Sequence, residues 1–406
     1  ILYIPCISRT LFLLFGGSSM RRAVRRHPAL AAIAATVALT VGLTGCHATE
    51  DSGKPPSIQA SVGEAATNVN VVSPILVQAT SGTLGSVRLT NDETGKEVKG
   101  TQEGNHWSST EPLGYDQSYT IKSFATKGDK RFNFQRNFHT VKPDNFTMPW
   151  IYPLDGTVAG VAQPVAVKFD EPIGNRQAAQ DCIHIKTSPK VDGAFYWMSD
   201  TEVRWRGEHF WKPGTKINID VKCYGHDLGD SLYGQKDLHS AYTIGDRVEG
   251  FADDNTHQLT IKKNGQVIKT IPISMGSDAH PTPNGIYYIG DKHESMIMDS
   301  STFGVPTNSP EGYKTTVYWA TRMSYSGIFI HAAPWSLWAQ GSSNTSHGCL
   351  NVSPENGEWV YHTMKAGDPV FVKNTKGGTL EGIEGLGDWN IPWSQWKAGN
   401  ANQNTN

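Results

Sequence analysis

The sequence predicts a mostly β protein in which two β-sandwich domains precede a third β-rich domain with one or two helices. Two observations support this fold class. Short apolar or alternating runs recur along the chain, and Gly, Asn and Asp turn residues separate them. About 360 residues follow Cys46, which is too many for one hydrophobic core and suits two or three domains.

The chain begins with a predicted leader. Residues 1–19 precede the first plausible initiator, Met20, and are expected to be translated upstream sequence. Residues 20–45 have a basic start and an apolar stretch before Cys46, the layout of a secretory signal that ends in a lipobox. A mature chain that begins at an acylated Cys46 would be anchored to the outer face of the cytoplasmic membrane. The apolar stretch has about fifteen residues, short of the roughly twenty that span a bilayer, so a transmembrane anchor is the weaker alternative.

The first domain is expected after a polar tether. Residues 46–67 are rich in Ser, Gly, Lys and Pro and predict a flexible connection. Residues 68–145 then hold apolar or alternating runs, such as 69–77 and 118–122, between turn residues. This pattern is typical of a β-sandwich, and no catalytic constellation occurs in it.

Residues 146–245 repeat the same rhythm and predict a second immunoglobulin-like sandwich, with a short helix near 175–181. The aromatic side chains Trp205, Phe210 and Trp211 are interpreted as a sandwich core or domain junction, and carbohydrate binding is the alternative. Asp227 and Asp230 flank a Gly turn and are candidate calcium ligands. Two carboxylates fall short of the roughly six to eight oxygens that calcium takes, so a solvated loop is the other interpretation.

Cysteine usage agrees with export. Of the five cysteines, Cys6 lies in the upstream stretch, Cys46 in the lipobox and Cys349 in a catalytic motif described below. Cys182 and Cys223 remain, each next to an alternating run that could be one of two neighbouring strands. We therefore predict a disulfide between them, with two free buried thiols as the alternative.

The third domain is predicted over residues 246–373. Two alternating runs, 258–261 and 266–269, are joined through Asn264-Gly265, a strong signal for a two-residue hairpin. The apolar spacing in 354–365 suits one amphipathic helix. Residues 374–406, rich in Gly and Trp, are expected to pack back on this domain.

A nucleophile and a base lie close together in the third domain. Cys349 follows His331 by eighteen positions, inside Thr-Ser-His-Gly-Cys-Leu-Asn. A thiol attacks well only when a base takes its proton and donors hold the oxyanion, and we assign these roles to His331 and the Gly348 backbone. Ser346, His347 and Asn351 add polar groups around the thiol. A structural, buried cysteine is the alternative.

These residues resemble the L,D-transpeptidases of the bacterial cell wall, whose YkuD-type catalytic domain carries a His, a spacer and then Ser/Thr-His-Gly-Cys-x-Asn. The resemblance extends to four further segments and looks most like the mycobacterial and related actinobacterial members. These segments are 298–301, 324–327, 331–335 and 387–393.

The resemblance implies a reaction without a metal or organic cofactor. Cys349 would attack the third residue of a peptidoglycan tetrapeptide stem, release D-Ala and leave a thioester. The side-chain amine of a neighbouring stem would then form a 3→3 cross-link. The family also reacts with carbapenem β-lactams, so covalent trapping at Cys349 is expected. The two sandwiches would act as spacers.

The resemblance also assigns site residues. The carbonyl of Ala332 would orient His331, and residues 292–313 would form a flap over the site. Tyr313, Ser326, Gly327, Asn351 and Ser346 match substrate-contacting positions. His347 would either polarise the thiolate or support the turn, and we name His331 as the base.

Two other functions stay open. A papain-like cysteine peptidase or L,D-carboxypeptidase would transfer the acyl group to water instead of an amine, although its sequence around the nucleophile looks different. The second is an inactive wall-binding lipoprotein. The presence of His331, Gly348 and Cys349 argues against it, because an inactive protein would not need to keep them. The net charge of −2 offers no basic face for nucleic acid.

Overall fold

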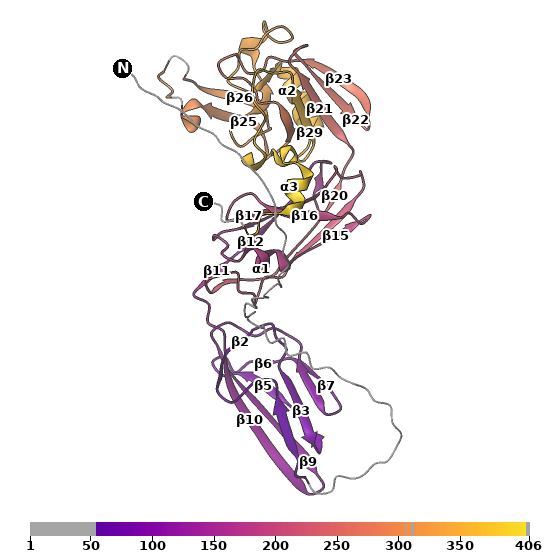
Figure 1. Cartoon of the computed structure of the whole chain (residues 1–406), viewed down its shortest axis with the longest axis vertical. Helices are drawn as coiled ribbons and strands as arrows, with labels where there is room; N and C mark the ends of the chain where they lie inside the picture. Colours follow the sequence, from indigo (N-terminus) through magenta and orange to yellow (C-terminus); the bar gives the residue numbers. More distant parts are fainter. Residues whose placement is uncertain (1–53, 305, 310–311, 403–406) are drawn as a thin grey trace, which may run out of the picture. The chain divides into compact units, whose positions relative to one another are not determined.

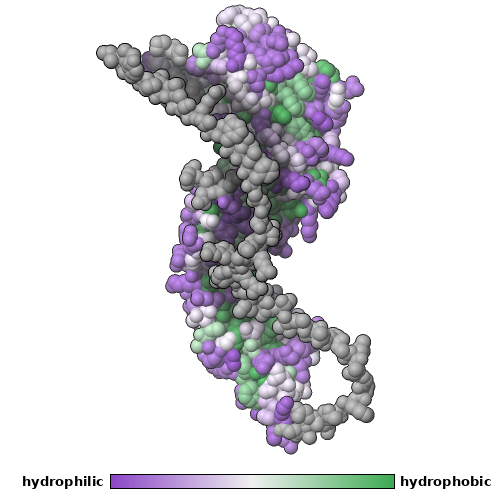
Figure 2. All heavy atoms as spheres, in the orientation of Figure 1, coloured by the Kyte–Doolittle hydropathy of each residue, from purple (hydrophilic) through white to green (hydrophobic). Residues whose placement is uncertain are grey.

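The computed structural model describes residues 54–304, 306–309 and 312–402, and is shown in Figure 1. The predicted leader and the predicted acylation site at Cys46 lie outside the described residues. Within the described residues, no helix combines the length and the apolar character needed to cross a membrane. On the face drawn in Figure 2, hydrophilic residues cover most of the described surface and hydrophobic ones form smaller patches.

The first domain is a sandwich of two sheets, with strand orders β1-β3-β8-β7 and β2-β10-β9-β5-β6. Its alternating runs bury one face of each sheet around Val77, Leu89 and Ile121. The strands are β1 (Ser57–Ala60), β2 (Ala66–Val69), β3 (Leu76–Ser81), β4 (Thr83–Leu84), β5 (Arg88–Asn91), β6 (Glu97–Val98), β7 (Gly100–Glu103), β8 (His106–Ser109), β9 (Ser118–Lys127) and β10 (Lys130–Thr140).

The predicted tether is too long. β1 pairs with β3, and the side chains of Ile58 and Val62 are buried in the core of the first domain. These two isolated apolar residues stand among polar ones, so the sequence pattern did not show them as core. The ordered sandwich therefore begins at Ser57 rather than at residue 68.

The second domain is also a sandwich, with strand orders β12-β14-β17-β16 and β13-β20-β18-β15. The predicted short helix is present, and its first turn is capped by the side chain of Asn175. The elements are β11 (Asn145–Thr147), β12 (Pro149–Tyr152), β13 (Val158–Ala159), β14 (Val165–Phe169), α1 (Arg176–Asp181), β15 (Ile183–Ser188), β16 (Gly193–Trp197), β17 (Glu202–Gly207), β18 (Lys216–Val221), β19 (Leu232–Gly234) and β20 (Leu238–Ile244).

The disulfide between Cys182 and Cys223 is confirmed, with Cα atoms 5.2 Å apart. Strands β15 and β18 are neighbours, and Ile183 pairs with Val221. This register brings the two cysteines together just beyond the paired residues. Both lie in the buried core of the second domain.

The aromatic cluster of the second domain is not a carbohydrate site. Trp205 and Trp211 are buried and stacked, with ring centroids 5.8 Å apart, and the Trp211 indole N–H donates to the Gln163 carbonyl. Phe210 packs edge-on against Trp389, at 4.5 Å between centroids. The core and junction interpretation is therefore the one that the structure supports.

The calcium prediction finds no support. The Asp227 carboxylate accepts the N–H of Gly229 at 2.9 Å, which makes it part of the turn itself. Among the residues that the structure describes, no group of three or more His, Cys, Asp or Glu side chains could hold a metal ion.

The third domain packs two sheets and one helix around a shared core. The sheet orders are β23-β22-β21-β29-β24 and β25-β26-β27-β28, and α2 packs against β26 and β27 (Figure 1). The elements are β21 (Val248–Asp253), β22 (Gln258–Lys263), β23 (Gln266–Pro272), β24 (Gly285–Tyr288), β25 (Lys292–Asp299), η1 (Ser300–Phe303), β26 (Lys314–Arg322), β27 (Phe329–Ala332), η2 (Pro334–Ser336), β28 (Leu350–Val352), α2 (Pro354–Thr363) and β29 (Pro369–Lys373).

Two local predictions for this domain are confirmed. Asn264 and Gly265 both have positive φ, 50° and 85°, as a two-residue hairpin turn between β22 and β23 requires. The amphipathic helix is α2, which begins after Ser353 caps the N–H of Asn356 and buries Val360. The first part of the predicted flap, residues 292–299 of 292–313, forms strand β25.

The C-terminal extension contains η3 (Gly382–Glu384), η4 (Asp388–Asn390) and α3 (Trp393–Ala398). Its first part lies against the third domain, where Asn390 bonds both backbone groups of Ile286. Its last part packs on the second sandwich instead, which corrects the prediction. Trp396 of α3 is buried, stacks on Tyr196 and donates its indole N–H to the Ala194 carbonyl. The large indole of Trp396 packs where the second sandwich offers space of matching shape. A local sequence pattern does not show where that space is.

Candidate active site

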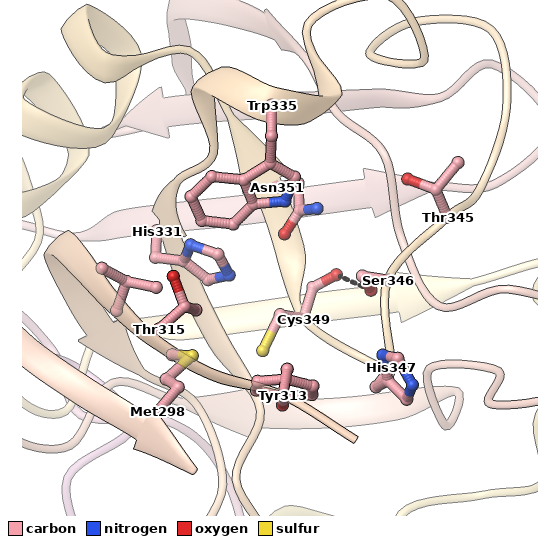
Figure 3. A pocket seen from close by; sticks show the side chains of 11 residues that line it. Met298, Tyr313, Thr315, His331, Trp335, Thr345, Ser346, His347, Cys349 and Asn351 are labelled. Carbon is pink, nitrogen blue, oxygen red and sulfur yellow. Dashed lines mark hydrogen bonds between the residues drawn. The ribbon is translucent and has the colours of Figure 1, made fainter. Parts of the chain in front are cut away.

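A pocket of about 370 Å³ opens at the ends of β27 and β28. Both predicted catalytic side chains line it, with His331 on β27 and Cys349 immediately before β28 (Figure 3). The parallel pairing of β27 with β28 places His331 opposite Asn351, so that Cys349 comes two residues before that partner. The lining residues are Met298, Tyr313, Thr315, Val317, His331, Trp335, Thr345, Ser346, His347, Cys349 and Asn351.

His331 is held in one orientation. Its Nδ1 lies 2.9 Å from the Ala332 carbonyl oxygen, which confirms the expected partner. A carbonyl only accepts hydrogen bonds, so Nδ1 carries the proton and Nε2 keeps its lone pair. Burial lowers the pKa of His331 below its ordinary value. The ring is therefore a neutral base at neutral pH.

Cys349 is a buried free thiol. Burial raises its pKa to about 11, while a backbone N–H from Phe329 acts in the opposite direction. In the part of the chain that the structure describes, the thiol donates its hydrogen bond to the Gly327 carbonyl, at 3.5 Å, and not to His331. The resting pair is thus a neutral thiol beside a neutral imidazole.

The turn that presents Cys349 is fixed by side chains. Gly348 has a φ of 120°, a conformation that favours glycine. Its N–H donates to Ser346 Oγ at 3.0 Å, and Ser346 Oγ donates in turn to the Cys349 carbonyl at 2.7 Å. In this arrangement the Gly348 N–H donates inside the turn, and its assignment to the oxyanion stays a prediction.

Ser346 has a structural role in the site. Beyond its bonds within the turn, its backbone N–H donates to the Met275 carbonyl and its carbonyl accepts from Ser277. Thr282 Oγ1 adds a hydrogen bond to the Gly348 carbonyl at 2.8 Å. The nucleophile turn is therefore tied to residues 275–282, a contact that no sequence motif revealed.

Asn351 lines the pocket with one unused acceptor. Its Nδ2 donates to Ser336 Oγ at 3.2 Å. Within the described residues, its buried Oδ1 has no hydrogen-bond partner. A buried carbonyl oxygen without a donor is costly, so this atom is suited to accept an N–H from a bound substrate.

The other predicted substrate contacts divide into two groups. Tyr313 lines the pocket, and burial raises the pKa of its hydroxyl to about 12. Gly327 touches the thiol only through its carbonyl. Ser326 is not among the lining residues: its N–H donates to the Glu384 carboxylate and its hydroxyl bonds Ser324.

His347 is exposed and stacks on His280, with ring centroids 4.6 Å apart, and lies 5.2 Å from the Tyr313 ring. Figure 3 shows it on the opposite side of Cys349 from His331. It therefore forms part of the pocket wall, and the structure favours the structural alternative for this residue over a catalytic one.

Several residues of the site were not predicted. Thr315 and Val317 line the pocket from β26, and their alternation along a strand is the one signal that could have pointed to them. Glu384 supports the loop at Ser326 from about 58 residues away in the sequence, which no local pattern can show.

Residues 249–372 match the L,D-transpeptidase catalytic domain, and residues 66–227 match a bacterial Ig domain. L,D-transpeptidase 2 of Mycobacterium tuberculosis is 52% identical over 359 residues, covering 86% of this chain and 88% of the relative. L,D-transpeptidase 5 of the same species is 32% identical over 352 residues, covering 84% of this chain and 76% of the relative.

Solved structures also match part of the chain. One is an L,D-transpeptidase in complex with imipenem, 36% identical, with a TM-score of 0.49, covering 55% of this chain and 97% of that one. The pocket geometry, the domain match and the 52% identity over 86% of the chain agree with one another. On these grounds the chain belongs to the L,D-transpeptidase family, with immunoglobulin-like domains before its catalytic domain.

Proposed function

We propose that this chain is a peptidoglycan L,D-transpeptidase that forms 3→3 cross-links between stem peptides. One observation carries the proposal: a buried thiol and an imidazole with a free Nε2 lone pair line the same pocket. Family membership supports the substrate class.

In the first half of the reaction, His331 Nε2 takes the Sγ proton as the sulfur attacks the carbonyl carbon of the third stem residue. The tetrahedral intermediate then collapses, and the bond to D-Ala breaks. The leaving amine takes the proton from the imidazolium, so D-Ala departs with a neutral amino group and Cys349 carries a thioester.

In the second half, the side-chain amine of a neighbouring stem attacks the thioester carbonyl. His331 takes a proton from the attacking nitrogen and returns it to the departing sulfur. An amide replaces the thioester and the thiol is restored. The unused Oδ1 of Asn351 is placed to accept an N–H of the bound stem.

The raised pKa of the thiol gives this site a particular order of events. Burial favours the neutral forms of Cys349 and His331, so transfer of the thiol proton to the imidazole before the attack is uphill. Attack coupled to proton transfer avoids a free buried thiolate. Substrate binding is then the event that starts the chemistry.

Carbapenems are expected to acylate the same thiol, since their strained amide resembles the scissile bond. A relative has been solved in complex with imipenem. Intact-protein mass spectrometry should show one adduct on the wild type and none on Cys349→Ser. An adduct that survives this substitution would contradict the proposed nucleophile.

We further propose that Cys46 is acylated and anchors the protein to the outer face of the cytoplasmic membrane, with the immunoglobulin-like domains as spacers toward the wall. The lipobox before Cys46 supports this placement. Metabolic labelling with a palmitate analogue should mark the wild type and not Cys46→Ala. Equal labelling of both would contradict acylation at that sulfur.

The decisive experiment is incubation of the full chain with disaccharide-tetrapeptide, followed by mass spectrometry of the muropeptides. A 3→3 dimer that lacks one D-Ala and is absent with Cys349→Ala is the expected product. Tripeptide alone would instead indicate an L,D-carboxypeptidase, and no product from a folded chain would indicate a binding lipoprotein.

A further inference from the structure

An exposed apolar platform stands directly outside the catalytic pocket. Trp338 is 74% exposed, and Trp335 and Leu337 are each 52% exposed. Trp335 also lines the pocket, so the platform is continuous with the site. Large apolar side chains gathered on a surface usually mark a binding site.

The platform is held rigidly. The Ala333 carbonyl accepts the Ser336 N–H and the Gln340 side chain, and the Ser336 carbonyl accepts the Ala339 N–H. Ala339 is fully buried beneath the exposed side chains. A second tie reaches the site, because Ser336 Oγ accepts a hydrogen bond from Asn351. The exposure is therefore built into the fold, and ordering the loop costs a ligand little entropy.

The segment that carries the platform is polar and has no acidic residue, lysine or arginine of its own. Residues 332–354 contain no Lys, Arg, Asp or Glu. Gln340, Ser342 and Ser343 lie two to five residues after Trp338. A membrane surface is bound by apolar side chains together with basic ones, which are missing from this run. Aromatic faces beside amides and hydroxyls instead suit a neutral sugar, whose ring has an apolar face and a polar rim.

The reach of the substrate fits this position. From the attacked carbonyl of the third residue, an extended stem needs about 10 Å to arrive at its sugar, at roughly 3.3 to 3.6 Å per residue. Three Cα steps separate Trp335 from Trp338, so their Cα atoms are at most about 11 Å apart. The sugar of a stem bound at Cys349 therefore falls within the range of the platform.

We propose that Trp338, with Leu337 and Trp335, forms a subsite for the N-acetylhexosamine of the glycan strand that carries the bound stem. This inference rests on the proposed function, since it names a part of the same substrate. Trp338 is here a specificity-determining residue, and it takes no part in the chemical steps.

The test compares the full chain on disaccharide-tetrapeptide and on the free tetrapeptide, with D-Ala release as the readout. Trp338→Ala should raise KM for the disaccharide substrate about threefold to tenfold with kcat unchanged, and leave the free peptide unaffected. Trp338→Tyr should restore most of the loss. Phe132→Ala, a 41% exposed aromatic in the first domain, is the matched control and should change neither substrate.

Other outcomes overturn the proposal. An unchanged KM for the disaccharide substrate would do so, as would an equal loss on both substrates, which would assign Trp338 to the peptide or to the fold. Sedimentation of the wild type, but not of Trp338→Ala, with phosphatidylglycerol vesicles would assign the platform to the membrane. Unchanged imipenem acylation of Trp338→Ala shows that the variant is folded.

A measurement without turnover separates this inference from the proposed function. Saturation-transfer NMR with triacetylchitotriose on Cys349→Ala should detect sugar binding that is lost when Trp338→Ala is added. If the wild type releases D-Ala from neither substrate, the proposed function fails and this measurement still decides the sugar subsite. No saturation transfer to the sugar would reject the subsite.

Discussion

At the scale of single residues, two shifts in opposite directions define the catalytic pair. Burial raises the pKa of Cys349 to about 11 and lowers that of His331. Both shifts favour the neutral forms, so the thiol and the imidazole are both uncharged before the reaction begins. The lone pair on His331 Nε2 is nonetheless available, because the Ala332 carbonyl fixes the proton on Nδ1.

This arrangement predicts the pH profile of imipenem acylation. The lowered pKa of His331 keeps the base neutral, so the wild-type rate should be flat around pH 7 and fall only below the ordinary histidine range. His331→Ala should be about 10²- to 10⁴-fold slower at pH 7. Its rate should then rise toward pH 11 as the thiol ionises on its own. Stopped-flow measurements from pH 5 to pH 10 would check both curves, and a wild-type rate that climbs with pH up to 10 would contradict base-assisted attack.

At the scale of elements, the loop between β26 and β27 depends on the C-terminal extension. The Glu384 carboxylate of η3 accepts the N–H groups of Ser326 and Leu386. The next residue, Gly327, supplies the carbonyl that receives the Cys349 thiol. A distant element therefore positions the acceptor that holds the nucleophile.

Glu384→Ala is expected to slow imipenem acylation about tenfold, because it leaves two backbone N–H groups without their acceptor. Glu384→Gln keeps an acceptor oxygen and should retain most of the rate. Glu381→Ala removes an exposed carboxylate of the same extension and serves as the control. The same loss in the Gln variant as in the Ala variant would argue against this positioning role.

The disulfide of the second domain also acts at this scale. Its cysteines are 41 residues apart, and a loop of that length predicts about 4 kcal/mol of stabilisation. Cys182→Ala combined with Cys223→Ala should lower the free energy of unfolding of this domain by about that amount in urea denaturation. Dithiothreitol should destabilise the wild type and leave the double variant unchanged, whereas a wild type insensitive to reduction would contradict the prediction.

At the scale of the whole described unit, two arginines of β17 join the second sandwich to the C-terminal extension. Arg204 bonds the Asp388 carboxylate at 2.6 Å and the Tyr288 hydroxyl at 2.7 Å. Arg206 donates to the Ile391 carbonyl and lies over the rings of Trp389 and Trp396. Buried charges require partners. The second sandwich and the C-terminal extension are therefore expected to unfold together.

Arg204→Met should therefore destabilise the chain by about 3 to 5 kcal/mol, because it leaves the buried carboxylate of Asp388 without its cation. Differential scanning calorimetry would measure the loss. Adding Asp388→Asn should recover part of it, since the unpaired charge is then removed. Arg88→Ala breaks an exposed pair with Glu97 and should cost at most about 1 kcal/mol. Equal effects of the two arginine substitutions would contradict a special role for the junction.

The sequence by itself predicted the order of the domains, the hairpin at Asn264-Gly265, the helix after Ser353, the pairing of Cys182 with Cys223 and the placement of His331 and Cys349 in one site. Each of these depends on residues close in sequence or on a chemical requirement of one residue type. Strand alternation, capping and the need of a thiol for a base are all visible in a linear chain.

Only the tertiary structure decided the remaining features. It showed that the Gly348 N–H is used by Ser346, that Glu384 supports the loop at Ser326, and that α3 packs on the second sandwich. Each of these contacts forms because it packs well or because it satisfies a buried hydrogen-bonding group. Such contacts depend on which distant segments meet in the folded chain. A local sequence pattern does not contain this information.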